Sequence, residues 1–325
     1  MRSISAIVPN YNGRELLEKN LPSLIQELSR ACQDFEVIIV DDCSTDDSVD
    51  FLNAHYAEHI IIAKEKNEGF SATCNAGIQK AGKALIFLMN SDIILTEGYF
   101  EPQFKYFEQE DTFGVMGKII GYFDDKIQDT AKLPIMRGLK LKADNNYLLE
   151  DHQEGFWTPT IYLSGANALM DAQKLKAMGG FDEIYSPFYS EDLDLGIRAH
   201  RLHWKCYYEH RAVCRHEGSV STGKLRKTWV DTIARRNRFF VHGIHYNGWR
   251  LWLYNLQIAF EMMFRWVNFR FGVYFGYWEY LNSSKKMRQS KKQLEELAYP
   301  QKPLSLKEIV QRHYDSIDTY KIKRV

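Results

Sequence analysis

Residues 35–46 read FEVIIVDDCSTD, an apolar run that ends abruptly in acidic and hydroxyl side chains. A run rich in Ile and Val without polar alternation is typical of a strand buried on both faces of a sheet. Residues 4–8 (ISAIV) and 84–89 (ALIFLM) have the same apolar character, and Pro9 is expected to end the first of them. Strands of this kind occur in parallel sheets that helices cover on both sides, so the three segments predict an α/β fold.

Helical patterns lie between these strands. Leu17, Leu21, Leu24 and Leu28 recur at the spacing of one helix face, although Pro22 is expected to kink or restart that helix. The alternation of the two patterns predicts a mostly parallel central sheet flanked by helices. The other predicted elements are helices over 47–55, 71–81 and 99–109 and strands over 60–63 and 113–120.

Polar side chains follow four of the predicted strands. They occupy residues 9–12 (PNYN), 41–46 (DDCSTD), 67–70 (NEGF) and 90–92 (NSD). Ligands of open parallel sheets bind beyond the carboxyl ends of the strands, so these segments together predict a binding site. Each segment taken alone is also compatible with an ordinary turn, since Asp, Asn and Ser favour turns.

The familiar phosphate-binding loops are missing. The sequence has neither GxGxxG after a strand nor GxxxxGK[ST]. Side chains would therefore have to hold a nucleotide, with Asp42 accepting a hydrogen bond from the base and Tyr11 stacking on it. A diphosphate among so many carboxylates requires a cation, and Asp92, just beyond a buried strand, is the natural anchor for Mg²⁺ or Mn²⁺.

A second acidic cluster, Glu191-Asp192-Leu193-Asp194, precedes a helical segment over 195–202. The helix dipole favours acidic residues in a first turn, but three carboxylates in four residues exceed what capping requires. One of them is suited to act as a general base beside a substrate hydroxyl.

A strand predicted over 206–213 leads to His216. Cys206, His210, Cys214 and His216 raise the alternative of a zinc site, but alternation along a strand would point these side chains to both faces of the sheet. His216 alone, at a strand end beside the carboxylates, is the better candidate for a metal ligand.

The formal net charge of zero conceals two oppositely charged parts. Residues 1–200 contain 18 basic and 32 acidic side chains, whereas residues 201–325 contain 24 basic and 10 acidic side chains. The acidic part needs a cation before it can bind an anionic ligand. The basic part favours phosphate, nucleic acid or an anionic membrane surface as its partner.

Aromatic residues are concentrated in the basic part, where 16 of the 42 residues from Phe239 to Tyr280 are Phe, Trp or Tyr. One interpretation is a helical appendage whose aromatic side chains are buried against the core. The interpretation that we favour is a peripheral membrane surface, with Trp and Tyr at the headgroup level and Lys and Arg beside anionic lipid. Nucleic acid is not expected as a partner, because no nucleic-acid recognition fold accompanies the composition. The basic side chains are Lys224, Arg226, Lys227, Arg235, Arg236, Arg238, Lys285, Lys286, Arg288, Lys291 and Lys292.

Composition also predicts the compartment. No basic and apolar leader follows Met1, and the five cysteines are scattered without a CxxC pair, which favours reduced thiols in the cytoplasm. The apolar stretch over 251–260 is too short to span a membrane, which takes about twenty residues. We therefore expect a cytoplasmic protein that is peripheral on the inner face of the cytoplasmic membrane.

Taken in order over about residues 3–222, these segments resemble the family 2 glycosyltransferases, which have the GT-A fold. Within that family the chain looks most similar to bacterial rhamnosyltransferase-like enzymes of cell-surface polysaccharide assembly. The resemblance implies a catalytic domain over residues 1–222 and a basic, aromatic-rich helical region over residues 223–325. Further segments that carry it are NEGFSATCNAGI (67–78), SGANALM (164–170), GGFDE (179–183), FYSEDLDLG (188–196) and HEG (216–218).

The resemblance also implies roles. A nucleoside-diphosphate sugar would donate the sugar to a glycan or lipid-linked acceptor, with inversion of the anomeric centre. Asp192 matches the general base and Glu191 a supporting carboxylate. Asp92 and His216 match ligands of Mn²⁺ or Mg²⁺, although Asn90 replaces the first Asp of the family's DxD motif. The residues implied in nucleotide-sugar binding are Pro9, Tyr11, Asp41, Asp42, Asn67, Gly69, Asn90 and Ser91.

Two other functions are compatible with parts of the pattern. A catalytically inactive, membrane-bound assembly factor on the same fold is supported only by Asn90, since Asp92, Asp192 and His216 are all present. A sugar nucleotidyltransferase would need a Gly-rich loop with a basic residue after the first strand, and residues 9–13 do not supply one.

Overall fold

The computed structural model describes residues 3–149, 157–217, 226–265, 272–317 and 321–325. Within these residues the main sheet has ten strands. Eight of them follow the spatial order β10-β12-β6-β11-β4-β1-β2-β3, with β5 beside β12 and β7 beside β6. The strands are β1 Ser3–Asn10, β2 Asp34–Asp41, β3 Ile60–Ala63, β4 Leu85–Met89, β5 Ile93–Leu95, β6 Thr112–Gly121, β7 Ile127–Asp129, β10 Thr158–Pro159, β11 Asn167–Asp171 and β12 Lys205–His216.

Strand direction brings the predicted polar segments to one edge of the sheet. β1 is parallel to β2 and β4, and β2 is parallel to β3. β11 runs antiparallel between β4 and β6, and β12 is parallel to β6, so β12 ends at the same edge as β4. The mostly parallel sheet confirms the predicted α/β fold. Pro9 does not end β1 as expected, because β4 pairs with it only as far as Ile7 and the missing N–H interrupts no bond to that neighbour.

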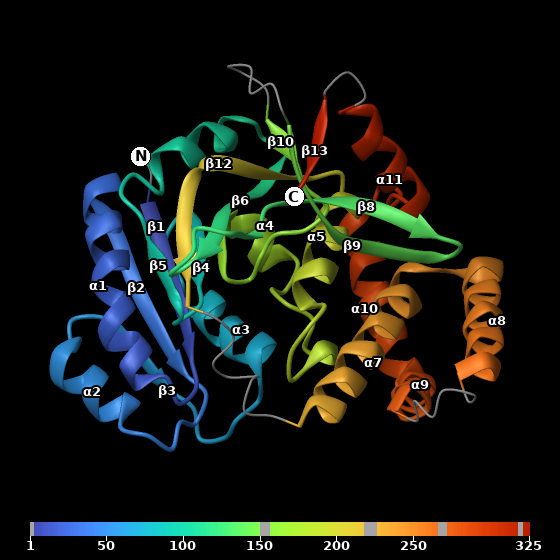
Figure 1. Ribbon diagram of the computed structural model, residues 1–325, viewed down its shortest axis with the longest axis horizontal. Helices are drawn as coiled ribbons and strands as arrows, with labels where there is room; N and C mark the ends of the chain where they lie inside the picture. Colours follow the sequence, from blue (N-terminus) through green and yellow to red (C-terminus); the bar gives the residue numbers. More distant parts are fainter. Residues whose placement is uncertain (1–2, 150–156, 218–225, 266–271, 318–320) are drawn as a thin grey trace.

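Helices cover both faces of this sheet (Figure 1). Leu17 of α1 packs with Ile4 and Val8 of β1 on one face, whereas Cys74 of α3 packs with Ile7 on the other. α1 is unbroken through Pro22, so the predicted restart is wrong. The helices of this part are α1 Arg14–Ala31, α2 Ser48–His55, α3 Phe70–Lys80, α4 Ala172–Ala177 and α5 Glu191–Arg201, with 3₁₀ turns η1 Glu101–Glu108 and η2 Glu183–Tyr185.

A second, three-stranded sheet lies against this core. β8 (Ala131–Arg137) and β9 (Lys140–Leu149) form a hairpin, and β13 (Ile322–Arg324) pairs antiparallel with β9. The sequence pattern does not predict β13, which forms by pairing with β9. Ile322 packs against the core cluster, which holds the terminal strand in place.

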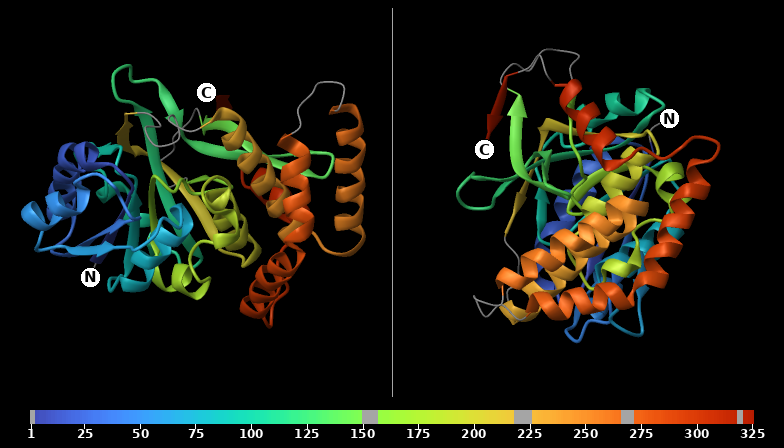
Figure 2. Two further views of the ribbon diagram at one scale, coloured as in Figure 1. Left: turned by 90° about the horizontal axis from the view of Figure 1, so that it is seen from below. Right: turned by 90° about the vertical axis from the view of Figure 1, so that its right-hand side faces the viewer.

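The C-terminal helices form a layer beside α5 and the hairpin, with α8 at the edge farthest from α2 (Figures 1 and 2). Phe240 and Tyr280 are buried in the same cluster as the core, as the interpretation of a packed helical appendage expects. Trp249 and Trp252 of α8 are more than 60% exposed, and the membrane surface stays a prediction. No described helix is long and apolar enough to cross a membrane. These helices are α7 Lys227–His245, α8 Gly248–Arg265, α9 Gly272–Asn282, α10 Ser284–Ala298 and α11 Leu306–Asp315.

The predicted division of the chain between residues 222 and 223 falls outside the described residues, as do Lys224 and the segment 218–225 around it. The division into a catalytic domain and a helical region stays a prediction.

Candidate active site

A cavity of about 760 Å³ opens at the carboxyl ends of β1, β2 and β4. All of the predicted site residues except Asp41 line it, although they come from six separate parts of the chain. The parallel sheet explains why these segments meet, since it aligns the strand ends that carry them. The lining residues from the prediction are Pro9, Tyr11, Asp42, Asn67, Gly69, Asn90, Ser91, Asp92, Glu191, Asp192 and His216.

Asp41 faces away from this cavity. Its carboxylate accepts hydrogen bonds from Asn10 Nδ2 at 2.8 Å and from the Ser44 N–H at 2.8 Å, and the residue is almost completely buried. Asp41 is absent from the cavity lining, and its predicted contact with a nucleotide stays a prediction. Asp41 instead fastens the loop after β2 to the end of β1.

Asp42 lines the cavity and also shapes its wall. Its carboxylate accepts from Lys64 Nζ at 2.8 Å, from the Glu68 N–H at 3.0 Å and from the Gly69 N–H at 2.8 Å. Gly69 has a φ of +88°, and a Cβ there would lie 2.8 Å from Pro187 Cα. Only glycine fits this backbone, because any other side chain would collide with Pro187. The close packing of Gly69 against Pro187 forms this part of the cavity wall.

Asp92 and His216 meet where β4 and β12 end. His216 Nε2 lies 3.1 Å from Asp92 Oδ2, and His216 Nδ1 lies 2.6 Å from Gln128 Oε1. Because Gln128 Oε1 is an acceptor, Nδ1 carries the proton, and the Nε2 of a neutral ring turns a lone pair toward the Asp92 carboxylate. A cation bound by both groups would satisfy that arrangement.

Two buried oxygens beside this pair, Asp92 Oδ1 and Asn90 Oδ1, have no hydrogen-bond partner among the described residues. Oxygen atoms of this kind are the ligands that Mg²⁺ and Mn²⁺ prefer. No group of three His, Cys, Asp or Glu side chains suited to a metal occurs in the described parts of the chain, and this includes the Cys and His residues of β12. The protein ligands available for a cation in the cavity are therefore Asp92 and His216, with the Asn90 amide oxygen beside them.

Glu191 and Asp192 begin α5 after Ser190, which has a φ of +72°. Burial raises the pKa of Asp192 to about 6; the Leu193 N–H, 2.7 Å from Asp192 Oδ1, opposes this shift, whereas the Asp129 carboxylate adds to it. Burial, together with the neighbouring Asp192 carboxylate, raises the pKa of Glu191 to about 8. Near neutral pH, Asp192 is thus ionised while Glu191 holds a proton.

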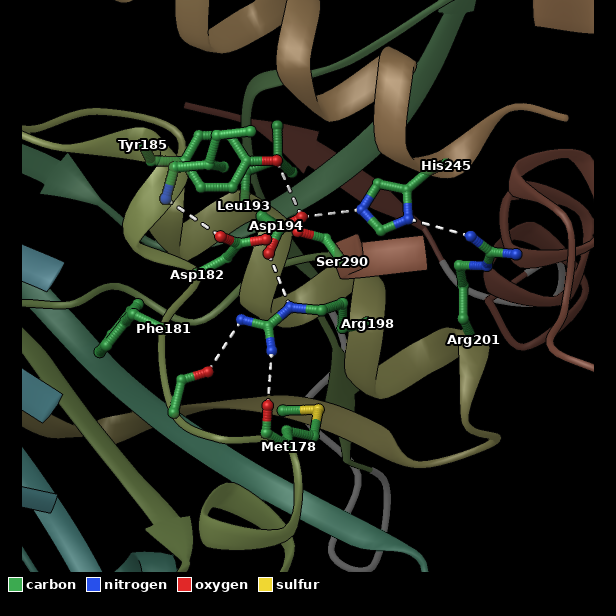
Figure 3. A network of polar contacts seen from close by, with 12 residues as sticks. Met178, Phe181, Asp182, Tyr185, Leu193, Asp194, Arg198, Arg201, His245 and Ser290 are labelled. Carbon is green, nitrogen blue, oxygen red and sulfur yellow. Dashed lines mark hydrogen bonds and ion pairs between the residues drawn. The ribbon is translucent and has the colours of Figure 1, made fainter. Parts of the chain in front are cut away.

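Asp194, the third carboxylate of this cluster, points away from the cavity into a buried polar network (Figure 3). It accepts from Arg198 Nε at 2.6 Å, from Tyr185 OH at 2.9 Å and from His245 Nε2 at 2.9 Å. Burial favours the neutral acid, but the Arg198 charge and the His245 hydrogen bond prevail and lower the pKa of Asp194 to about 2. Arg201 Nη1 donates to His245 Nδ1 at 3.2 Å, so the imidazole is neutral and donates from Nε2. Asp194 joins α5 to α7.

One part of the cavity wall is not indicated by any sequence motif. Asp129 of β7 and Lys132 of β8 form an ion pair at 3.0 Å, and the Tyr162 hydroxyl donates to Asp129. Both residues face the cavity that contains Asp192. They lie in the segment 121–160, which has no short motif, and only the hairpin brings them to the site.

A second cavity, of about 530 Å³, adjoins the first. Tyr189, Asp192 and Lys132 line both, so the candidate base stands in the wall between them. The remaining wall of the second cavity comes from β9, α7 and α8.

Residues 5–178, just over half of the chain, match the model of the family described as Glycosyl transferase family 2. The uncharacterized glycosyltransferase YfnE of Bacillus subtilis (strain 168) is 24% identical over 237 residues, which cover 61% of this chain and 60% of that protein. The poly(ribitol-phosphate) beta-N-acetylglucosaminyltransferase TarP of Staphylococcus aureus (strain N315) is 26% identical over 147 residues, which cover 44% of either chain. The chain thus spans less than two thirds of the length of these relatives.

Solved structures share the fold. GalNAc-T7 with UDP, GalNAc and Mn²⁺ has a TM-score of 0.68 at 13% identity and covers 98% of this chain, which in turn covers 58% of GalNAc-T7. TarS 1-349 of S. aureus in complex with UDP-GlcNAc has a TM-score of 0.52 at 16% identity, covering 92% of this chain and 82% of that one. The predicted GT-A fold is confirmed.

Proposed function

The chain belongs to the family 2 glycosyltransferases, and on that basis we propose that it moves a sugar from a nucleoside-diphosphate sugar to a hydroxyl group of a glycan or lipid-linked acceptor. The observation that carries this proposal is the position of Asp192 in the wall between two adjoining cavities. One cavity would hold the donor and the other the acceptor. A base between them removes the proton of the attacking hydroxyl without moving either substrate.

The donor is assigned to the cavity at the strand ends. Tyr11 is 43% exposed at its rim, so its ring is available to stack on the nucleotide base. The Asp42 carboxylate is held in place by Lys64 and by two backbone N–H groups, which leaves a fixed acceptor for a base N–H. Structures that share the fold contain UDP or UDP-GlcNAc, which supports a nucleotide-sugar donor.

Asp92 and His216 are proposed to hold Mn²⁺ or Mg²⁺ at the donor diphosphate. Such sites commonly use one or two protein ligands and take the remaining oxygens from the substrate phosphates, which suits the small ligand set here. Asn90 offers its unpartnered amide oxygen in place of the usual first Asp. When bound, the cation would neutralise the charge that develops on the leaving diphosphate.

The transfer itself needs one carboxylate. The acceptor oxygen forms a bond to the anomeric carbon while the bond from that carbon to the diphosphate oxygen breaks, and the electron pair leaves with the diphosphate. The acceptor proton passes to Asp192, whose Oδ1 is held by the Leu193 N–H and whose other oxygen can accept it. Attack from the face opposite the leaving group inverts the anomeric centre.

We also place the enzyme on the inner face of the cytoplasmic membrane, as a peripheral protein of cell-surface polysaccharide assembly. The support is the outer side of α8, where Trp249, Trp252, Leu256 and Phe260 recur at helical spacing and are each more than half exposed. Aromatic side chains on an interfacial helix lie at the lipid headgroups. Helix α10 contributes the exposed Lys285, Lys286, Arg288 and Lys292 for anionic lipid.

A donor screen tests the proposed function. Thermal shift with a panel of nucleotide sugars, each with Mn²⁺ and again with EDTA, should identify a donor that stabilises the protein only with metal. The selected donor should then be hydrolysed slowly in the absence of an acceptor. Binding without hydrolysis or transfer to any acceptor would instead support the inactive assembly factor, and no stabilisation by any donor would contradict the proposal.

A further inference from the structure

The second cavity is strongly basic. It lies between the β8–β9 hairpin, the start of α5, and helices α7 and α8. Two carboxylates, Asp192 and Glu261, face five cationic side chains across it. The cationic side chains are Lys132, Lys140, Lys142, Arg235 and Arg238.

Two of these cations are paired with carboxylates. Lys140 pairs with Glu261, and Lys132 pairs with Asp129 at 3.0 Å. Arg235 and Arg238 add positive charge to the cavity from α7.

Two of the arginines of α7 line the second cavity. Arg235 and Arg238 are three residues apart, so they lie on the same side of the helix. Arg235 pairs at 3.0 Å with Asp231, whose side chain is 64% exposed, and an ion pair this exposed contributes little. Arg238 makes no side-chain hydrogen bond or ion pair with any residue in the described ranges. Both guanidinium groups are thus available to an anion.

The floor beneath these charges is apolar and neutral. Tyr254, Ile258 and Phe239 contribute to it, and His242 stacks on Tyr254 with ring centroids 4.7 Å apart. His242 Nε2 accepts from the Leu141 N–H at 2.8 Å and Nδ1 donates to the Arg238 carbonyl at 2.7 Å, so the ring carries no charge. Burial lowers the pKa of His242 to about 4, which agrees with this assignment.

The donor diphosphate is not the anion that Arg235 and Arg238 are placed to bind. The first cavity has its own proposed cation ligands, and among the described residues the basic side chains that line it are Lys132 and His216. Arg235 and Arg238 line the second cavity alone. An anion bound to them would lie on the acceptor side of Asp192.

We propose that the second cavity is an acceptor site that recognises a phosphate group on the acceptor, through Arg235 and Arg238, while the acceptor hydroxyl faces Asp192. This proposal rests on the proposed function and specifies its acceptor class as a phosphorylated saccharide or polyol. Guanidinium groups bind phosphate with two parallel hydrogen bonds, which orients as well as attracts the ligand. The phosphate can belong to a prenyl-phosphate carrier or to a polyol phosphate.

Binding of small phosphate compounds tests the site in the full chain. Calorimetric titration without metal would use citronellyl phosphate and glycerol 3-phosphate, with citronellol and glycerol as neutral counterparts. We expect the double variant Arg235→Gln/Arg238→Gln to bind the phosphates at least about tenfold more weakly than the wild type. Arg235→Lys/Arg238→Lys keeps the charge and should recover part of the loss. Lys80→Gln/Lys307→Gln removes the same charge from exposed helix positions and should bind like the wild type.

The outcomes separate this site from the donor reaction. Acceptor-independent donor hydrolysis should be unchanged in the Gln double variant, since neither arginine lines the donor cavity. Equal phosphate binding by the wild type and the Gln variant, or equal binding of the neutral counterparts, would overturn the proposal. Loss of donor hydrolysis together with phosphate binding would also overturn it, by placing the arginines at the donor. Absence of donor hydrolysis in the wild type would refute the proposed function alone. Tighter binding of citronellyl phosphate would assign a lipid carrier, and tighter binding of glycerol 3-phosphate a polyol phosphate.

Discussion

The two cavities that meet at Asp192 are built in different ways. The first is made by loops at the ends of parallel strands, with acidic and amide side chains in short, continuous segments. The second is made by one side of a hairpin and two helices, with basic side chains that are spread over more than a hundred residues of sequence. The sheet edge imposes the geometry of the first cavity, whereas the second depends on how the C-terminal helices pack. The first cavity is thus lined mainly by acidic and amide groups, and the second mainly by basic groups.

The same contrast occurs within one helical turn. Asp192 faces the cavities and has a raised pKa, whereas Asp194 faces the protein interior and has a lowered pKa. One carboxylate is kept without a cationic partner of its own, and the other is tied to Arg198 and His245. Substitutions at the two positions should therefore affect different properties.

The largest effect is expected for Asp192→Asn. Loss of a general base should lower the rate of transfer by about 10²–10⁴-fold, while the dissociation constant of the donor changes little. Burial raises the pKa of Asp192, so its ionisation costs stability as pH rises from about 4 through 6, and the neutral Asn should leave the melting temperature unchanged or higher at pH 7. Steady-state kinetics measures the transfer rate, and calorimetry measures the donor dissociation constant and the melting temperature. Asp50→Asn, an exposed acid in the first turn of α2, is the control. Near wild-type turnover in Asp192→Asn would remove the base assignment.

The next effect is a loss of stability in Asp194→Asn. Removing one partner of a buried ion pair typically costs about 3–5 kcal/mol, because Arg198 would stay buried without its counter-charge. The pKa of Asp194 is depressed, so its stabilising contribution is complete above about pH 4 and disappears as pH falls toward 2. Urea unfolding at pH 7 measures the difference. Wild-type stability in this variant would show that the network in Figure 3 contributes nothing.

A smaller effect concerns pH. Asp192 must be ionised to accept a proton, so kcat/KM should fall about tenfold per pH unit below a pKa of about 6 and level off above it. The groups that face Asp192 are Glu191, Asp129 and Lys132. Asp129→Asn removes a negative charge that raises this pKa, and should move the acidic limb to lower pH. An acidic limb that stays in place would mean that Asp129 does not act on the base.

The smallest effect is expected on the outer side of α8. Trp252 is 64% exposed there, and Trp252→Ala should weaken binding to anionic phosphatidylglycerol vesicles a few-fold in a sedimentation assay. Phe123→Ala is a matched control, because Phe123 is 84% exposed in the turn between β6 and β7 and does not belong to α8. Equal losses in both variants, or none in either, would argue against a lipid-facing helix.

The sequence predicts the first cavity well because each of its parts is local. A buried apolar run indicates a strand, and the polar turn that follows it indicates the edge of the sheet at which the turn side chains lie. This pattern predicts that Tyr11, Asn67 and Asp92 lie together, and all three line the first cavity. The adjacent Asp41 and Asp42 differ in that only Asp42 lines the cavity, whereas Asp41 accepts a hydrogen bond from the Ser44 N–H in the turn. The sequence pattern does not distinguish two adjacent carboxylates of this kind.

The second cavity could not be predicted in this way. Arg235 and Lys140 are brought together by packing between α7 and the hairpin, and neither belongs to a motif. The strand β13 was missed for the same reason, since a three-residue strand owes its existence to the partner β9. Asp194 and Asp192 look equivalent in sequence, and only the position of His245 more than fifty residues later separates their roles.

The contact between α5 and α7 has an evolutionary consequence. Asp194, His245 and Arg201 lock these helices together, so the segment that carries Asp192 has little freedom to shift. The hairpin and α8, which form the remaining walls of the second cavity, are outside this network. Replacement of residues on those walls can therefore alter which acceptor is admitted while the reacting carboxylate keeps its place. A fold built this way can diversify the glycans that it makes at low risk to its chemistry.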